Sequence, residues 1–181
     1  MILAYKTIFE SIQEKTGGRS KSRDWYRKEI TGLSPSKVIN DERSDEVGDE
    51  LERDRNLSTT FPRLFNLMFY QYEAKTRRDL PFYDKYPLAF VLETDSNSFF
   101  AVNLHYYSPE ERMGLVMSLA EDKIPKFRKG AHKYLLSEVR SPYLILAQQE
   151  WQTMCLLPVE EFVRDLGGVE IPIPSNKVWG R

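Results

Sequence analysis

The chain carries few side chains suited to nucleophilic or acid–base chemistry. It has two histidines, His105 and His132, and a single cysteine, Cys155. A Ser/His/Asp or Cys/His site needs a histidine beside a nucleophile, whereas His105 lies in an expected strand and His132 lies beside Lys133 in an expected helix. We interpret both histidines as structural or surface residues and keep a catalytic base as the alternative. No HExxH or EF-hand pattern occurs, so no metal ion or other cofactor is predicted.

Asp84 is the one acid in a rigid aromatic setting, because it stands between Tyr83 and Tyr86 in a loop bracketed by two prolines. We interpret Asp84 as an acceptor of backbone N–H bonds that fixes this loop, with His105 organising the loop against the hairpin that follows. A nuclease or another enzyme would instead require Asp84, His105 and nearby acids to converge in a cleft.

The other reactive groups have simpler interpretations. Cys155 stands in the apolar run 154–157, where a buried and inert thiol is expected. The dense carboxylates lie in the polar run 41–54, which indicates a charged surface or a basic partner. The sequence therefore predicts a protein that is not an enzyme.

The basic side chains give a clearer indication of function than the acidic ones do, and they favour a binding role. The first group mixes cations with an aromatic ring, as proteins do on nucleic-acid backbones and bases, and consists of Arg19, Lys21, Arg23, Trp25, Arg27 and Lys28. The second group is expected on one helix face and consists of Lys126, Lys129 and Lys133. Both groups are candidates to bind phosphates or a partner's acids. The preferred alternative is that these lysines solvate a helix or meet the acidic segment of a neighbouring subunit.

The composition bounds the class of protein. The chain has 181 residues, of which 41% are hydrophobic and 29% are charged, so one domain with a genuine core is expected. The formal net charge is −1, and no global field recruits nucleic acid or membrane. The first residues do not have the pattern of a signal peptide, and no apolar run is long enough to span a bilayer. We expect a soluble protein without membrane contact.

Charge and hydropathy divide the chain into three parts: a charged N-terminal arm over residues 1–60, a core domain over 61–170 and an extended tail over 171–181. In the arm we expect helices over residues 2–14, from Asp24 onward, and from Ser34-Pro35 onward. Gly17-Gly18 is expected to stop the first helix. The arm should be ordered only where it packs on something else.

The pattern of the core predicts an α+β fold. Strands are expected over residues 64–72, 88–94, 99–107, 143–146 and 151–157, the second and third forming a hairpin. Ser108-Pro109-Glu110-Glu111 is a capping box that opens a helix, and further helices are expected over 126–139 and 159–166. We predict a small antiparallel sheet or an SH3-like partial barrel with helices on one side, preceded by the extended or helical arm.

Two segments resemble a known pattern: LPFYDKYPL at residues 80–88 and FFAVNLHYY at residues 99–107. Together they are similar to the "LPYYDxFPL…GLNLHYL" pattern of a group of virion proteins from contractile-tailed phages. Residues 21–28, 139–143 and 150–160 are also similar to that group. The chain departs from the pattern where Ala101-Val102 replaces the usual glycine, and its spacer after the hairpin is short.

The resemblance implies a non-enzymatic virion protein, labelled in that group as a DNA end protector, a head-completion protein or a baseplate component. It implies a place at the head–tail axis, in a symmetric multi-subunit assembly built in the host cytoplasm. The implied partners are other virion proteins and packaged DNA ends. A baseplate or tail component that binds only protein is the alternative.

Overall fold

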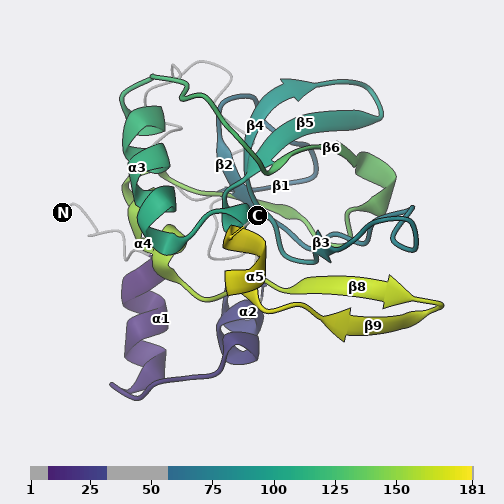
Figure 1. Ribbon diagram of the computed structural model, residues 1–181. Helices are drawn as coiled ribbons and strands as arrows, with labels where there is room; N and C mark the ends of the chain where they lie inside the picture. Colours follow the sequence, from purple (N-terminus) through teal and green to yellow (C-terminus); the bar gives the residue numbers. More distant parts are fainter. Residues whose placement is uncertain (1–7, 32–56, 181) are drawn as a thin grey trace.

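The computed structural model describes residues 8–31 and 57–180 (Figure 1). The helix predicted from Ser34-Pro35 and the acidic run 41–54 lie outside the described residues, as do residues 2–7 of the first predicted helix. The described part is α+β, as predicted, with two antiparallel sheets and several short helices. The two antiparallel sheets do not close into a barrel.

Six strands form the larger sheet, in the order β1-β7-β2-β4-β5-β6. Their bounds are β1 Leu57–Thr59, β2 Leu67–Phe69, β4 Leu88–Thr94, β5 Ser98–Asn103, β6 Ala131–Leu135 and β7 Tyr143–Ile145. The smaller sheet has the order β3-β8-β9, with bounds β3 Tyr83–Asp84, β8 Phe162–Leu166 and β9 Val169–Pro172. The α-helices are α1 Ile8–Thr16, α2 Arg23–Thr31, α3 Pro109–Ala120, α4 Trp151–Leu156 and α5 Ser175–Trp179. Short 3₁₀ turns are η2 Leu104–Tyr106, η3 Leu136–Glu138 and η4 Gln148–Glu150.

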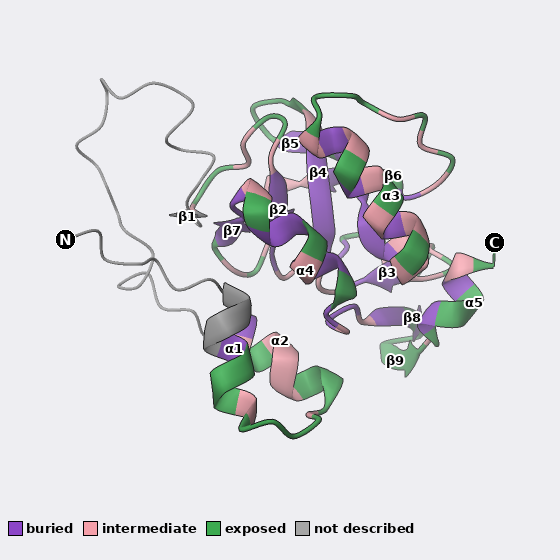
Figure 2. Ribbon diagram, turned by 90° about the vertical axis from the view of Figure 1, so that its left-hand side faces the viewer, coloured by how far each residue is buried: buried purple, intermediate pink, exposed green. Residues whose placement is uncertain are grey.

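The larger sheet separates two apolar clusters, because side chains alternate between the faces of a strand. On one face, Leu67 and Phe69 pack with α3 and α4, which lie side by side along one flank of the domain (Figure 1). On the other face, Met68 packs with aromatic residues and with the smaller sheet through Val163. Figure 2 shows that the central strands β2 and β7 are buried, whereas the edge strand β6 is mostly half-buried or exposed. The connection between β2 and β3 packs on this second face through Tyr72, Ala74 and Leu80.

The predicted hairpin is confirmed as β4 and β5, which pair in antiparallel register from Ala89↔Asn103 to Thr94↔Phe99. The capping box is also confirmed, because the Ser108 hydroxyl accepts from the Glu111 amide at 3.3 Å and the Glu111 carboxylate accepts from the Ser108 amide at 2.9 Å. These motifs are local, so neighbouring residues are sufficient to specify them.

The helix predicted over residues 126–139 is wrong, since β6 and η3 occupy its second half. Gly130 adopts φ +80°, and a Cβ atom there would lie 2.6 Å from the carbonyl oxygen of Asn103. This close approach brings the chain alongside β5, where β6 pairs from Ser98↔Leu135 to Val102↔Ala131. The apolar spacing that suggested a helix is overridden by long-range strand pairing.

Three further predictions near the C-terminal end are wrong. The apolar run at 151–157 forms helix α4 rather than a strand, an ambiguity that is intrinsic to short apolar runs. Residues 159–166 contain strand β8 rather than a helix, and the Gly167-Gly168 pair, at φ +65° and +94°, turns the chain into β9. The segment after residue 171 is not a simple extended tail, since it includes the end of β9 and helix α5.

The strand predicted over residues 64–72 is shorter in the structure. Strand β2 covers only Leu67–Phe69, and Tyr72 forms one isolated β-bridge with Val139.

Helices α1 and α2 pack against the rest of the domain (Figure 1). Ile12 of α1 and Ile30 of α2 are buried in the same cluster as α3 and α4, and Trp25 and Tyr26 pack against that cluster. The positive φ angles of Gly17 and Gly18 follow the end of α1, as predicted. The N-cap of α2 is Ser22 rather than Asp24, because the Ser22 hydroxyl accepts from the Trp25 amide at 3.2 Å. No helix among the described residues is long and apolar enough to cross a membrane.

Candidate functional site

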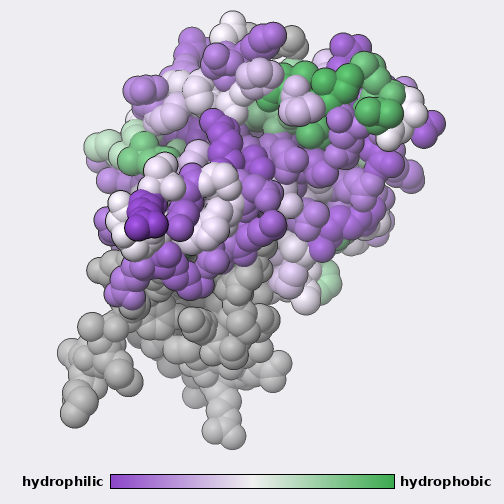
Figure 3. Space-filling view, turned by 90° about the horizontal axis from the view of Figure 1, so that it is seen from below, coloured by the Kyte–Doolittle hydropathy of each residue, from purple (hydrophilic) through white to green (hydrophobic). Residues whose placement is uncertain are grey.

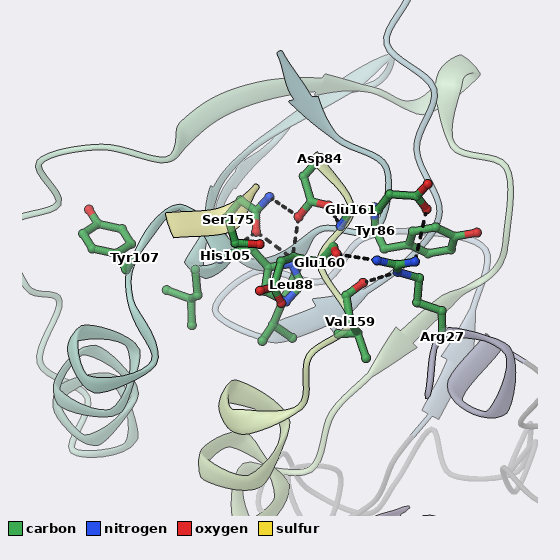
Figure 4. Close-up of polar contacts among 12 residues, drawn as sticks. Arg27, Asp84, Tyr86, Leu88, His105, Tyr107, Val159, Glu160, Glu161 and Ser175 are labelled. Atoms are coloured by element: carbon green, nitrogen blue, oxygen red, sulfur yellow. Dashed lines mark hydrogen bonds and ion pairs between the residues drawn. The ribbon is translucent and has the colours of Figure 1, made fainter. Parts of the chain in front are cut away.

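Asp84 is buried at the junction of the two sheets and uses both carboxylate oxygens (Figure 4). Its Oδ2 atom accepts from Asn103 Nδ2 at 2.9 Å and contacts His105 Nδ1 at 2.7 Å. Its Oδ1 atom accepts from the backbone amides of Tyr86 and Glu161, each at 3.0 Å. These contacts tie β3 to the hairpin and to the strand that follows residue 161.

The electrostatics favour the charged form of Asp84. Burial alone would raise the pKa of Asp84, but the neighbouring His105, with hydrogen bonds from His105, Asn103 and the Tyr86 amide, lowers it below the ordinary value of 3.8. The carboxylate is therefore a stable internal acceptor.

Arg112 and Glu160 extend this buried polar region. The Arg112 guanidinium donates to the carbonyl oxygens of Leu104 at 3.0 Å, Tyr107 at 2.8 Å and Cys155 at 3.1 Å. Its NH2 atom lies 3.7 Å from Glu160 Oε1, and both side chains are 2% exposed. Burial would raise the pKa of Glu160, but His105 and Arg112 lower it below its ordinary value. We call Asp84, Asn103, His105, Arg112 and Glu160 the polar node.

Two of the predicted binding residues, Arg23 and Arg27, contact the chain's own C-terminal part. Arg23 NH1 donates to Glu160 Oε1 at 3.0 Å and to the Ser175 hydroxyl at 3.2 Å. Arg27 donates to the carbonyl oxygens of Val159 at 2.9 Å and Glu160 at 2.6 Å (Figure 4). These contacts fasten α2 to the polar node.

The other predicted residues of the first group lie on α2 or in the connection that precedes it. Lys28 forms an ion pair with Asp24 at 3.1 Å, and the ammonium group of Lys21 lies 5.6 Å from the centre of the Trp25 ring. Trp25 is half-buried against the core, and Arg19 is exposed in the turn after α1. The structure therefore separates this group into cations that hold α2 and cations that face outward.

The second predicted group, Lys126, Lys129 and Lys133, does not share a helix face. Lys126 is exposed in the connection after α3, whereas Lys133 is exposed on β6. Lys129 Nζ donates to the carbonyl oxygen of Trp179 at 2.5 Å and lies over the Tyr107 ring. Of the three, Lys133 alone lines a pocket described next.

A pocket of about 230 Å³ opens between β6, β3 and the turn that precedes β3. We call it the aromatic pocket. Its buried floor consists of Tyr72, Ala74, Tyr83, Asp84 and Tyr134. Its half-buried wall consists of Leu80, Phe82, Tyr106, His132 and Leu135. Its exposed mouth consists of Lys75, Thr76 and Lys133.

The wall of the aromatic pocket is a continuous set of ring contacts. The Tyr106 ring centre lies 4.8 Å from that of His132 and 5.8 Å from that of Phe82. Burial lowers the pKa of His132 below 6.5, so its imidazole is neutral at neutral pH. Its Nε2 atom is buried and has no hydrogen-bond partner among the described residues. The pocket thus offers aromatic surface inside and two exposed lysines at its entrance.

Residue patterns could have indicated part of this pocket. The basic sequence Lys75-Thr76-Arg77-Arg78 immediately precedes the aromatic, proline-bracketed loop that carries Phe82. The contributions of Tyr106 and His132 depend on the pairing of β5 with β6, which the helix prediction over 126–139 did not foresee. The described residues contain no cluster of three or more His, Cys, Asp or Glu side chains arranged to hold a metal ion.

The fold and the site define a small α+β domain with an aromatic pocket and a basic mouth. The family model described as the phage T4 terminal DNA protecting protein matches residues 8–181, and the chain belongs to this family. It is therefore a phage protein whose family is described by protection of DNA termini. No curated protein and no solved structure matches the chain. Of the labels implied by the sequence resemblance, DNA end protector agrees with the family.

Proposed function

We propose that this chain is a non-enzymatic virion protein that binds the ends of packaged phage DNA and shields them from exonucleases. The family match over residues 8–181 carries this proposal. Two features of the structure support it. The aromatic pocket combines flat rings with lysines, which is the combination that binds single-stranded nucleic acid. The polar node, by contrast, directs Asp84 and Arg112 to partners inside the domain, which supports a role without chemistry.

Digestion of linear duplex DNA by an exonuclease, with and without the protein, tests the proposal directly. We expect protection that a linear competitor removes and that a closed circular competitor of equal mass leaves intact, because only the linear competitor has ends. Gel shifts at several salt concentrations should show binding that weakens as salt rises. Protection that circular DNA abolishes equally, or no protection at all, would contradict a function at DNA ends.

A role among other virion proteins is the second candidate, and one surface favours it. The β8–β9 hairpin projects from the domain, and its exposed apolar residues are Leu166 at 48%, Val169 at 64% and Ile171 at 41%. Figure 3 shows an apolar patch on the side where this hairpin projects. Such a patch suits a protein partner. We propose that other virion proteins hold the chain at the head–tail axis, in a symmetric assembly, as a head-completion or neck component.

A baseplate or tail component that binds only protein remains the alternative to this placement. The gel shift on linear DNA distinguishes the two, because a purely protein-binding component would not shift it at any salt concentration.

A further inference from the structure

The aromatic pocket places exposed lysines at its mouth and aromatic rings farther inside. Its three exposed residues are Lys75, Thr76 and Lys133, and they lie at the mouth, whereas the half-buried wall carries Phe82 and Tyr106. A ligand that fits this gradient has a flat neutral part inside and an anionic part outside.

The floor of the pocket argues against an anion inside. Asp84 is part of the floor and is held in its charged form, as its lowered pKa indicates. A phosphate placed at that depth would therefore meet a negative charge in a poorly solvated site, where repulsion is strong. A neutral base would meet the aromatic rings of Tyr72 and Tyr134 instead, because both are buried in the floor.

We propose that the aromatic pocket binds one unpaired nucleotide at a DNA end, with its base against the Phe82–Tyr106 wall and its phosphate at Lys75 and Lys133. The half-buried His132 ring lies 4.8 Å from the Tyr106 ring and extends this aromatic wall.

An end supplies such a base more readily than the middle of a duplex does. Extracting an internal base breaks its pairing and both stacking contacts, whereas a base in a single-stranded extension is already unpaired. The pocket therefore favours ends with single-stranded extensions over blunt ends and over continuous duplex. This inference rests on the proposed function and adds the part of the DNA that is recognised.

The test uses the full chain and linear duplexes that carry a fluorescent 2-aminopurine base, either in a terminal single-stranded extension or inside the duplex. We expect binding to quench the terminal probe, because the base stacks on aromatic rings, and to leave the internal probe unchanged. Replacing Phe82 by leucine (Phe82→Leu) should weaken binding to the extended end about ten-fold and reduce the quenching. The matched control, Phe61→Leu, removes a ring that is 67% exposed and outside the pocket, and should behave as the wild type.

The outcomes separate this inference from the proposed function. End binding and exonuclease protection without quenching of the terminal probe would overturn the pocket assignment and leave the proposed function standing. Equal quenching of both probes would overturn the preference for ends. An absence of DNA binding would overturn both. Because quenching is measured first on the wild-type chain, the result does not depend on the folding of the Phe82→Leu variant.

Discussion

The polar node and the aromatic pocket adjoin each other and share Asp84, yet they use charge in opposite ways. In the polar node, Arg112 and Glu160 are each 2% exposed, and the guanidinium is directed to carbonyl oxygens and a carboxylate of the same chain. In the aromatic pocket, Lys75 and Lys133 stand exposed at the mouth. The node uses its charges inside the domain, and the pocket exposes its charges to solvent.

The difference shows that a basic residue cannot be assigned to DNA from its type alone. Arg23 and Arg27 stand in the most suggestive basic stretch of the sequence, beside Trp25, yet both donate to the chain's own C-terminal segment. A cation used in this way would leave its internal acceptors unpaired if it moved to a phosphate. Lys75 and Lys133 are exposed at the mouth of the pocket, so binding a phosphate there would leave no buried acceptor unpaired.

The largest effect is expected from the centre of the polar node. Replacing Arg112 by methionine removes the cation beside buried Glu160 and the donors to four carbonyl oxygens, and should lower the free energy of unfolding by about 3–5 kcal/mol. Urea unfolding measures the change. Arg164→Met, at an exposed position on β8, serves as the control and should stay within about 0.5 kcal/mol of the wild type. Equal stability of the two variants would contradict the structural role of the node.

The next effect concerns pH. The folded chain lowers the pKa of Asp84 below 3.8, so this carboxylate stabilises the fold above its unfolded pKa and loses that contribution as the pH falls through its folded pKa. Asp84→Asn should cost about 1–3 kcal/mol at pH 7. Between pH 5 and about pH 2, the free energy of unfolding of the Asp84→Asn variant should then fall less than that of the wild type. Urea unfolding across this range checks both points.

The exposed carboxylate of Asp79 provides the control for the pH prediction. Asp79→Asn should retain the full acid sensitivity of the wild type, because its side chain is outside the polar node. If Asp84→Asn lost stability toward low pH as steeply as the wild type, Asp84 would not be a source of the acid sensitivity.

Local motifs account for the part of the fold that could be predicted from the sequence. The capping box at Ser108 and the polar turn of the β4–β5 hairpin are specified by residues close in sequence, and both are confirmed. Strand β6 could not be predicted in this way, because it exists through its pairing with β5 and through the close approach at Gly130. A strand was predicted where helix α4 lies and a helix where strand β8 lies, because short apolar runs do not distinguish helix from strand.

The candidate site was predictable only in fragments for the same reason. The aromatic, proline-rich sequence around Asp84 predicts that it contacts His105. In the structure, Asp84 Oδ2 lies 2.7 Å from His105 Nδ1. The aromatic pocket needed the position of Tyr106 relative to His132, which are far apart in sequence and meet only when β6 aligns with β5. Spacing within one segment carries no information on such a contact.

A pair of neighbouring cations on α2 sharpens the comparison between internal and outward charge. Arg27→Gln should lower the free energy of unfolding by about 1–2 kcal/mol, because it removes donors to the carbonyl oxygens of Val159 and Glu160. Lys28→Gln should change it by less than about 0.5 kcal/mol, since Lys28 is 77% exposed. Thermal or urea unfolding separates the two variants. A larger loss for Lys28→Gln would reverse the assignment of these cations.

The smallest effect is expected at the mouth of the aromatic pocket. Lys75→Gln and Lys133→Gln should each leave stability unchanged, because both lysines are exposed, and each should weaken binding to linear DNA only a few-fold. Their distinguishing effect is on the salt dependence: the slope of log affinity against log salt should flatten by about 0.7–0.9 for each lysine that neutralises a phosphate. Lys123→Gln is the matched control, since that exposed lysine pairs with Glu121 and lies outside the pocket. Unchanged slopes in both pocket variants would show that the outward charges of the pocket do not meet DNA.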